Sequence, residues 1–124
     1  MKTLIVLVLG LLAVGCATLT PEQKQKALRD SVVGEYELKH EKGDTHKLIF
    51  LEKGIVEHYK NGKKAGEETK WSISNKEIHV NHKGAIIVWR INKDKSITYI
   101  ADLDKDGKRE DRPKEHQPTY QKTK

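Results

Sequence analysis

Cysteine is nearly absent from this chain of 124 residues, which contains only Cys16. A single thiol cannot form an intramolecular disulfide, so the fold cannot rely on the cross-links that stabilise many small exported domains. The rest of the chain has no cysteine nucleophile, no G-x-S-x-G elbow and no Gly-rich phosphate loop. Its serines have no evident His/Asp partners. The sequence therefore predicts a protein that is not an enzyme.

Clusters of one charge are also missing. The 24 Lys/Arg and 18 Asp/Glu residues are interspersed, and the formal net charge is +6. Nucleic-acid-binding domains gather basic residues on one face and carry a recognisable motif, so we expect no nucleic-acid partner. Aromatic residues make up 6% and hydrophobic residues 35% of the chain. Because these residues recur at regular intervals, we expect a folded domain and not a disordered chain.

Only one long hydrophobic stretch is present, from Leu4 to Leu12. It is shorter than the roughly 20 residues that an α-helix needs to cross a bilayer. Lys2 precedes the stretch, and the small or compact residues Ala13, Val14 and Gly15 follow it. A positive residue, an apolar run and small residues are the layout of a secretory signal peptide. The sequence therefore predicts export of the chain and no membrane-spanning helix.

The residues LAVGC, which end at Cys16, resemble the lipobox of bacterial lipoproteins, although Ala13 replaces the usual larger aliphatic residue. The resemblance implies cleavage between Gly15 and Cys16 and attachment of diacylglycerol and further acyl groups, such as palmitate, to the cysteine. Two or more acyl chains anchor a protein stably. Ala17 in place of aspartate implies the outer membrane, facing the periplasm; in a Gram-positive host the domain would lie outside the cell membrane. The alternative is an ordinary signal peptide cleaved near Ala17.

We divide the chain into three segments: a signal peptide (1–15), a lipidated tether with a short helix (16–30) and a β domain (31–124). The helix is predicted from Thr20, which has the side chain of an N-cap, and from Pro21 at the first helical position. Gln23 completes a capping box with Thr20. The helix offers little apolar surface, so we expect it to rest against the edge of the domain.

From Val32 onward, apolar residues recur at every second position, which is typical of half-buried strands. The pair Asn61-Gly62 predicts a type I′ hairpin turn, and PTYQKT predicts a last strand. The fold class is all-β: a small antiparallel meander of about seven or eight strands, as a curled sheet or a lipocalin-like barrel. The predicted core consists of Tyr36, Leu38, Leu48, Phe50, Val56, Trp71, Ile73, Ile78, Val80, Ile87, Trp89, Ile91 and Tyr99.

The segment from Val32 to Ala101 resembles small lipocalin-like domains of bacterial lipoproteins. The resemblance rests on the spacings Gly34-x-Tyr36, Phe50-x-x-x-Gly54, Trp71-x-Ile73 and Ile78-x-Val80. It implies a barrel with a ligand cavity and without catalytic residues. Trp71, Trp89 and Tyr99 are the candidate cavity residues, since aromatic walls are common in such sites. The competing interpretation is that they only fill the core of a small barrel.

Two patterns could bind metal ions. DLDKDGKRED places Asp102, Asp104 and Asp106 at alternate positions of a calcium-loop template, but position twelve is Pro113, so that Glu110 or Asp111 would have to substitute. The alternative is a solvated hairpin. Among six histidines, the pairs His40/His46 and His79/His82 could hold zinc weakly, whereas His58 and His116 stand alone. We predict no metal site from the histidines and, calcium aside, no cofactor beyond the acyl groups on Cys16.

Taken together, the sequence predicts a lipid-anchored envelope lipoprotein with a monomeric β domain that acts through binding or structural interaction. One alternative is a carrier of a small apolar ligand. Another is an inhibitor or accessory subunit that presents the turn KNGKKAG to an envelope enzyme. The membrane is the predicted partner in all three cases.

Overall fold

The computed structural model describes residues 19–124, and the signal peptide, the lipobox and Cys16 lie outside the described residues. One helix, α2 (Pro21–Val32), precedes the strands. The strands of the main sheet are β1 (Gly34–Lys39), β2 (Thr45–Phe50), β3 (Ile55–Lys60), β5 (Thr69–Ser74), β6 (Glu77–His82), β7 (Ala85–Ile91), β8 (Ile97–Leu103) and β10 (Thr119–Lys122). The short elements are β4 (Lys63–Lys64), β9 (Arg109–Asp111) and the 3-10 turn η1 (Lys114–His116).

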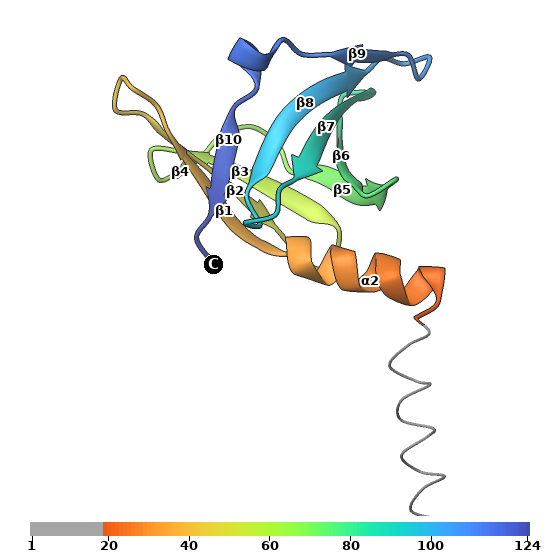
Figure 1. Ribbon diagram of the computed structural model, residues 1–124. Coiled ribbons are helices and arrows are strands. Elements are labelled where there is room, and N and C mark those ends of the chain that lie inside the picture. Colours follow the sequence, from red (N-terminus) through yellow and green to blue (C-terminus); the bar gives the residue numbers. More distant parts are fainter. Residues whose placement is uncertain (1–18) are drawn as a thin grey trace, which may run out of the picture.

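The main sheet closes into an antiparallel barrel (Figure 1). Neighbouring strands pair in chain order from β1 to β8, except that β4 pairs only with β3 and lies off this path. The last strand, β10, pairs with both β1 and β8, so the first and last strands of the sheet are joined. The predicted antiparallel β fold is confirmed, and it takes the closed form. Closure removes the unpaired edges that an open sheet would expose.

The turn chemistry read from the sequence is present in the β3–β4 hairpin. Asn61 has φ 52° and Gly62 has φ 82°, the two positive values that a type I′ turn requires. This part of the prediction is confirmed. The short strand β9 pairs only with β8, in the register Leu103↔Arg109, and was not predicted.

Helix α2 differs from the prediction, because it continues to Val32, past the predicted boundary at residue 30. The predicted start of the first strand at Val32 is therefore wrong, and β1 begins at Gly34. Burial explains the longer helix: Val32 is only 1% exposed and lies inside the barrel. Gly34, with φ 145°, then allows the chain to turn from the helix into the strand.

The helix lies across one end of the barrel and closes it (Figure 1). Gln25 Nε2 donates to the carbonyl of Ile73 at 3.2 Å, and Arg29 Nη1 donates to the carbonyl of Glu52 at 2.9 Å. The guanidinium of Arg29 also lies 4.6 Å from the centre of the Trp71 ring. These contacts fix α2 to the strand ends, so the helix seals the barrel and does not merely rest on its edge.

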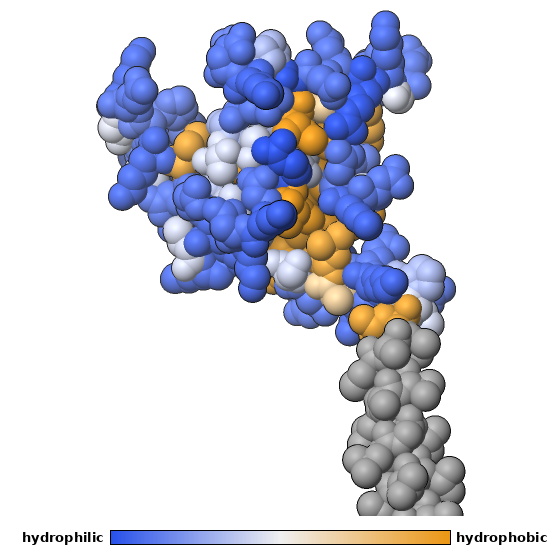
Figure 2. Space-filling model, in the orientation of Figure 1, coloured by the Kyte–Doolittle hydropathy of each residue, from blue (hydrophilic) through white to orange (hydrophobic). Residues whose placement is uncertain are grey.

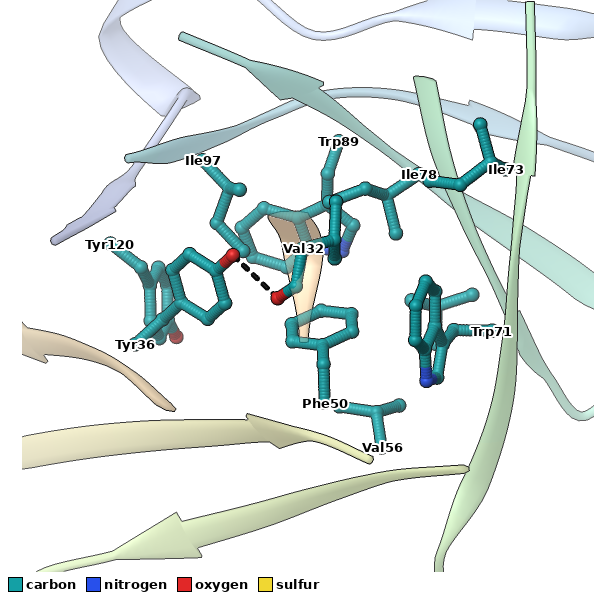
Figure 3. Packing of buried hydrophobic residues seen from close by; sticks show 11 residues of the cluster. Val32, Tyr36, Phe50, Val56, Trp71, Ile73, Ile78, Trp89, Ile97 and Tyr120 are labelled. Atoms are coloured by element: carbon teal, nitrogen blue, oxygen red, sulfur yellow. Dashed lines mark hydrogen bonds between the residues drawn. The ribbon is translucent and has the colours of Figure 1, made fainter. Parts of the chain in front are cut away.

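The barrel interior contains a continuous aromatic and aliphatic core (Figure 3). Tyr36, Phe50 and Trp71 pack edge to face, with ring centres 5.4 and 5.5 Å apart. Most predicted core residues are buried, and the structure adds Val32, Ile97 and Tyr120. The predicted members that are only partly buried are Leu38, Leu48, Ile87, Ile91 and Tyr99.

Candidate binding site at the open end of the barrel

A pocket of about 330 Å³ opens at the end of the barrel opposite α2. It is large enough for a small organic molecule, because ligand sites usually start at about 300 Å³. The floor and walls are apolar and come from strands β2, β3, β6 and β7: Leu48, Phe50, Val56, Val80, Ile87 and Trp89. Polar groups line the same pocket through His58, Glu67, Thr69 and His82.

The strand period explains this distribution. Side chains alternate between the two faces of a strand, so His58 shares the inner face with Val56, and His82 shares it with Val80. Both histidines lie near the strand ends that are farther from α2. The prediction that His58 stands alone is therefore wrong, because His58 and His82 line the same pocket. The alternation of polar with buried residues was a signal that could have placed both histidines in the pocket.

Three imidazoles form a row along the rim, on β1–β3. The rings of His40 and His46 have centres 5.3 Å apart, in agreement with the predicted pair across the hairpin. His46 Nδ1 and His58 Nε2 are 3.1 Å apart and form a hydrogen bond. The centres of these two rings are 5.4 Å apart, and the ring planes are nearly parallel, at 14° to each other. One imidazole must donate and the other must accept, which requires at least one of them to be neutral.

The electrostatic surroundings favour the neutral form of His58. Burial lowers the pKa of its imidazole, and the positive charges of His46 and Lys60 lower it further. At neutral pH, His58 therefore acts as an uncharged hydrogen-bonding group on the wall of the pocket. The open end thus combines an apolar interior with a few polar groups, among them the neutral imidazole of His58.

A second polar cluster lies on the β8 side of the barrel. The Tyr99 hydroxyl donates to the Asp102 carboxylate, and the Arg112 guanidinium lies 4.1 Å from the centre of the Tyr99 ring. Burial and the hydrogen bond to Asp102 raise the pKa of Tyr99. Arg112 also donates through Nε to the carbonyl of His116 at 2.7 Å, which ties η1 to this cluster.

The three predicted cavity residues have different positions. Trp89 lines the pocket. Tyr99 packs against Trp89 with ring centres 5.4 Å apart, so it supports the pocket from behind. Trp71 lies under Arg29 at the closed end, and its Nε1 donates to the carbonyl of Leu51 at 2.9 Å. Trp71 is therefore a core residue that contacts the helix and is not among the residues that line the pocket.

The predicted calcium-loop residues form the β8–β9 hairpin. The Asp104 carboxylate accepts hydrogen bonds from the backbone nitrogens of Asp106 and Lys108, each at 2.9 Å. Asp102 accepts from Tyr99, and Glu110 lies opposite Asp102 on the exposed strand β9. Within residues 19–124, no three His, Cys, Asp or Glu side chains are grouped so that they could hold a metal ion.

His79 lies on the opposite face of β6 from the buried residues Ile78 and Val80, and its Nε2 is 3.6 Å from Glu77 Oε1. Arg109 donates to both carboxylate oxygens of Glu77, at 3.0 and 3.1 Å. This hydrogen bonding lowers the pKa of Glu77. The network joins β9 to β6 across the outside of the barrel, which is a structural role.

Comparisons with known proteins give no match: no family model, no curated protein and no solved structure is similar to this chain. A search of residues 19–124 for a helix of the length and hydropathy needed to cross a membrane finds none. The geometry of the open end is therefore the basis for a functional proposal.

Proposed function

We propose that the protein is a lipid-anchored lipoprotein of the bacterial envelope whose barrel binds a small, largely apolar ligand through its open end. The observation that carries the proposal is the apolar pocket of about 330 Å³ at that end. Phe50 and Trp89 provide a hydrophobic floor, whereas His58 and His82 offer hydrogen bonds to one polar group of the ligand. Few polar groups on an apolar wall are the usual composition of small-molecule sites.

The geometry favours a carrier or sensor over an enzyme. The polar residues of the pocket form no nucleophile and base pair, and the two groups with strong hydrogen bonds nearby, Tyr99 and Asp102, bond to each other. Binding is the chemistry that an apolar wall with the neutral imidazole of His58 supports. We infer that the ligand is held by burial of its apolar part and oriented by the rim.

The anchor belongs to the same proposal and rests on the residues LAVGC that end at Cys16. Acylation at Cys16 would hold the barrel at the outer membrane, facing the periplasm. Mass spectrometry of the protein purified from the membranes of its host tests this part. We expect a chain that begins at Cys16 with diacylglycerol and acyl groups attached, and we expect the Cys16→Ser variant to lack them. An unmodified soluble product would contradict the anchor.

Ligand binding is tested with the chain from Ala17 onward, which keeps α2 and every strand. We expect it to bind an environment-sensitive apolar dye, and native mass spectrometry of protein from envelope extract to show a bound small molecule. In the Ala65→Trp variant, a large ring is added at a residue that lines the pocket. The variant should bind the dye about tenfold or more weakly, which corresponds to about 1.4 kcal/mol.

The matched control is Ala27→Trp, which adds the same ring on the exposed face of α2, at the closed end. This control should bind the dye as tightly as the parent chain. If both tryptophan variants bound equally well, or if the parent chain bound no dye and carried no small molecule, the pocket would not be a ligand site.

A further inference from the structure

A surface groove of about 750 Å³ lies at the closed end of the barrel, between α2 and the β5–β6 turn. Apolar residues of the helix and of the strands line it, among them Leu28, Ile73 and Ile91. Figure 2 shows apolar surface above and beside α2 with hydrophilic side chains around it. This groove is separate from the ligand pocket, which opens at the other end of the barrel.

The groove has a basic border. Within residues 19–124, the two ionisable residues that line it are Lys24 on α2 and Lys76 in the β5–β6 turn. Leu19, just before the helix, is 52% exposed and is the one exposed large hydrophobic residue in that part of the chain. Apolar surface next to lysines matches the interface of an anionic bilayer, where each basic residue near the surface adds about 1 kcal/mol of attraction, a factor of about five in binding.

The length of chain before the helix fixes how far this end can be from the anchor. Leu19 is three residues after Cys16. Three residues span at most about 11 Å when extended. A lipid on Cys16 would therefore keep the closed end of the barrel at the headgroup layer. Strands of six residues, such as β1, are about 20 Å long, so the open end would lie farther from the bilayer by about that distance.

From these observations we propose that the groove between α2 and the β5–β6 turn docks on the anionic headgroups of the membrane that holds the anchor, with the ligand pocket facing away from that membrane. The inference rests on the anchor in the proposed function. The outer face of α2 carries Glu22, Lys26 and Asp30. The helix lies on the headgroups and does not insert, because insertion would bury these charges.

The test uses the lipidated protein on vesicles that contain a nitroxide-headgroup lipid. Acylation consumes the thiol of Cys16, so a fluorophore can be attached to a single introduced cysteine. Lys26→Cys labels the exposed surface of α2, and Lys42→Cys labels the β1–β2 turn at the open end. We expect severalfold stronger quenching at residue 26 than at residue 42, and a larger ratio on anionic than on neutral vesicles.

The role of the two lysines is tested with Lys24→Gln combined with Lys76→Gln, which should lower the quenching ratio on anionic vesicles to its value on neutral vesicles. The matched control combines Lys63→Gln in β4 with Lys105→Gln in the β8–β9 turn, which removes the same charge from the open end and should leave the ratio unchanged.

Each outcome bears on one proposal. Equal quenching at residues 26 and 42, or stronger quenching at residue 42, would overturn the docked orientation. A ratio that responds neither to lipid charge nor to the loss of Lys24 and Lys76 would overturn docking through the groove. A protein that does not stay on the vesicles at all would refute the anchor itself, which is the failure of the proposed function and not of the orientation.

Discussion

At the scale of single residues, the Tyr36 hydroxyl is the polar group on which the core most depends. It donates to the carbonyl of Val32 at 2.6 Å, inside the barrel (Figure 3). Val32 is the last residue of α2, and the final carbonyls of a helix have no partner within it. Tyr36 therefore satisfies a buried helix end that would otherwise lack a donor.

We expect Tyr36→Phe to lower the free energy of unfolding by about 1–3 kcal/mol, because the Val32 carbonyl loses its donor inside the core. Urea-induced unfolding measures the change. Tyr120→Phe is the control: Tyr120 is also buried, at 9% exposure, but its hydroxyl makes no hydrogen bond to another residue of 19–124. Equal losses in the two variants would show that the bond to Val32 contributes nothing.

Burial also raises the pKa of Tyr36 to about 12. The unfolded chain has an ordinary tyrosine pKa of about 10, so the folded state resists deprotonation. The contribution of this group to stability is complete below about pH 10 and is lost as the pH rises toward about 12. We expect the stability of Tyr36→Phe to fall less steeply than that of the parent chain over this window, as measured by urea unfolding at several pH values. Parallel slopes would contradict this expectation.

The lowered pKa of His58 predicts the opposite pH dependence of stability, with a loss at acid pH. Its pKa is lowered by burial and then by His46 and Lys60, so the folded state holds its imidazole neutral. The stability that depends on this neutral form is present above the unfolded pKa of about 6.5 and is lost as the pH falls through the lower folded value. We expect the parent chain to lose thermal stability below about pH 6.5 and His58→Gln to lose less of it.

The control for this prediction is His116→Gln, which replaces an exposed histidine of η1. Its acid sensitivity should equal that of the parent chain. The same measurement repeated with bound dye would show whether the hydrogen bond between His46 and His58, 3.1 Å long, also changes the affinity of the pocket for the dye. If His58→Gln lost as much thermal stability at acid pH as the parent chain, groups other than His58 would be responsible for that loss.

At the scale of elements, the joint between α2 and β1 depends on Gly34. A Cβ atom at this position would lie 2.1 Å from the carbonyl oxygen of Lys124, and the same oxygen accepts a hydrogen bond from Glu35 N at 3.0 Å. Backbone cannot move aside as a flexible side chain can. The C-terminal segment therefore fits against β1 because residue 34 has no side chain.

We expect Gly34→Ala to destabilise the protein by several kcal/mol more than Gly43→Ala. Both glycines have positive φ, 145° and 89°, so both substitutions introduce backbone strain. A Cβ at Gly43, however, meets nothing within 4 Å. The difference between the two variants in urea unfolding isolates the clash with the C-terminus. Similar losses would indicate that the C-terminus moves away at little cost.

The elements themselves were largely predictable, because each depends on local signals. The pair Asn61-Gly62 accepts positive φ, and Thr20 forms its predicted capping box, in which Gln23 N donates to Thr20 Oγ1 at 3.1 Å. The end of α2 was not predictable in this way. In the sequence, Val32 also fits the apolar alternation of the strand that follows. Its burial inside the barrel, at the end of the helix, is not visible from that pattern.

The site was predicted less well than the elements. Trp89 lines the pocket, whereas Trp71, which looks alike in sequence, packs under Arg29 of the helix. Which of the two rings the helix covers depends on where α2 crosses the barrel. The place of His58 in the pocket was missed because a polar residue near a strand end is usually solvated. Its position two residues after Val56, however, puts it on the same inner face of β3.

At the scale of the whole molecule, the barrel has one sealed and one open end. The helix covers the sealed end, where its last residue, Val32, is buried and its carbonyl accepts the hydrogen bond from Tyr36. The polar loops at the other end leave room above Trp89. The walls of the pocket are formed by strands of the barrel, so we expect closure of the barrel to keep these walls in place.

The closing strand is β10, whose pairing with β1 joins residues as far apart in sequence as Tyr36 and Lys122. A chain that stops after Gln117 would leave β1 and β8 with unpaired edges, which are templates for association with other chains. We expect this truncated protein to lose its cooperative unfolding transition, to associate in sedimentation experiments and to lose dye binding.

Tyr120→Ala separates closure from packing, since it removes the buried ring of β10 and keeps its backbone. That variant should stay monomeric and cooperative while losing about 3–5 kcal/mol, the usual cost of removing a large buried aromatic ring. A truncated chain that still unfolded cooperatively as a monomer would show that the sheet does not need β10 to hold the pocket.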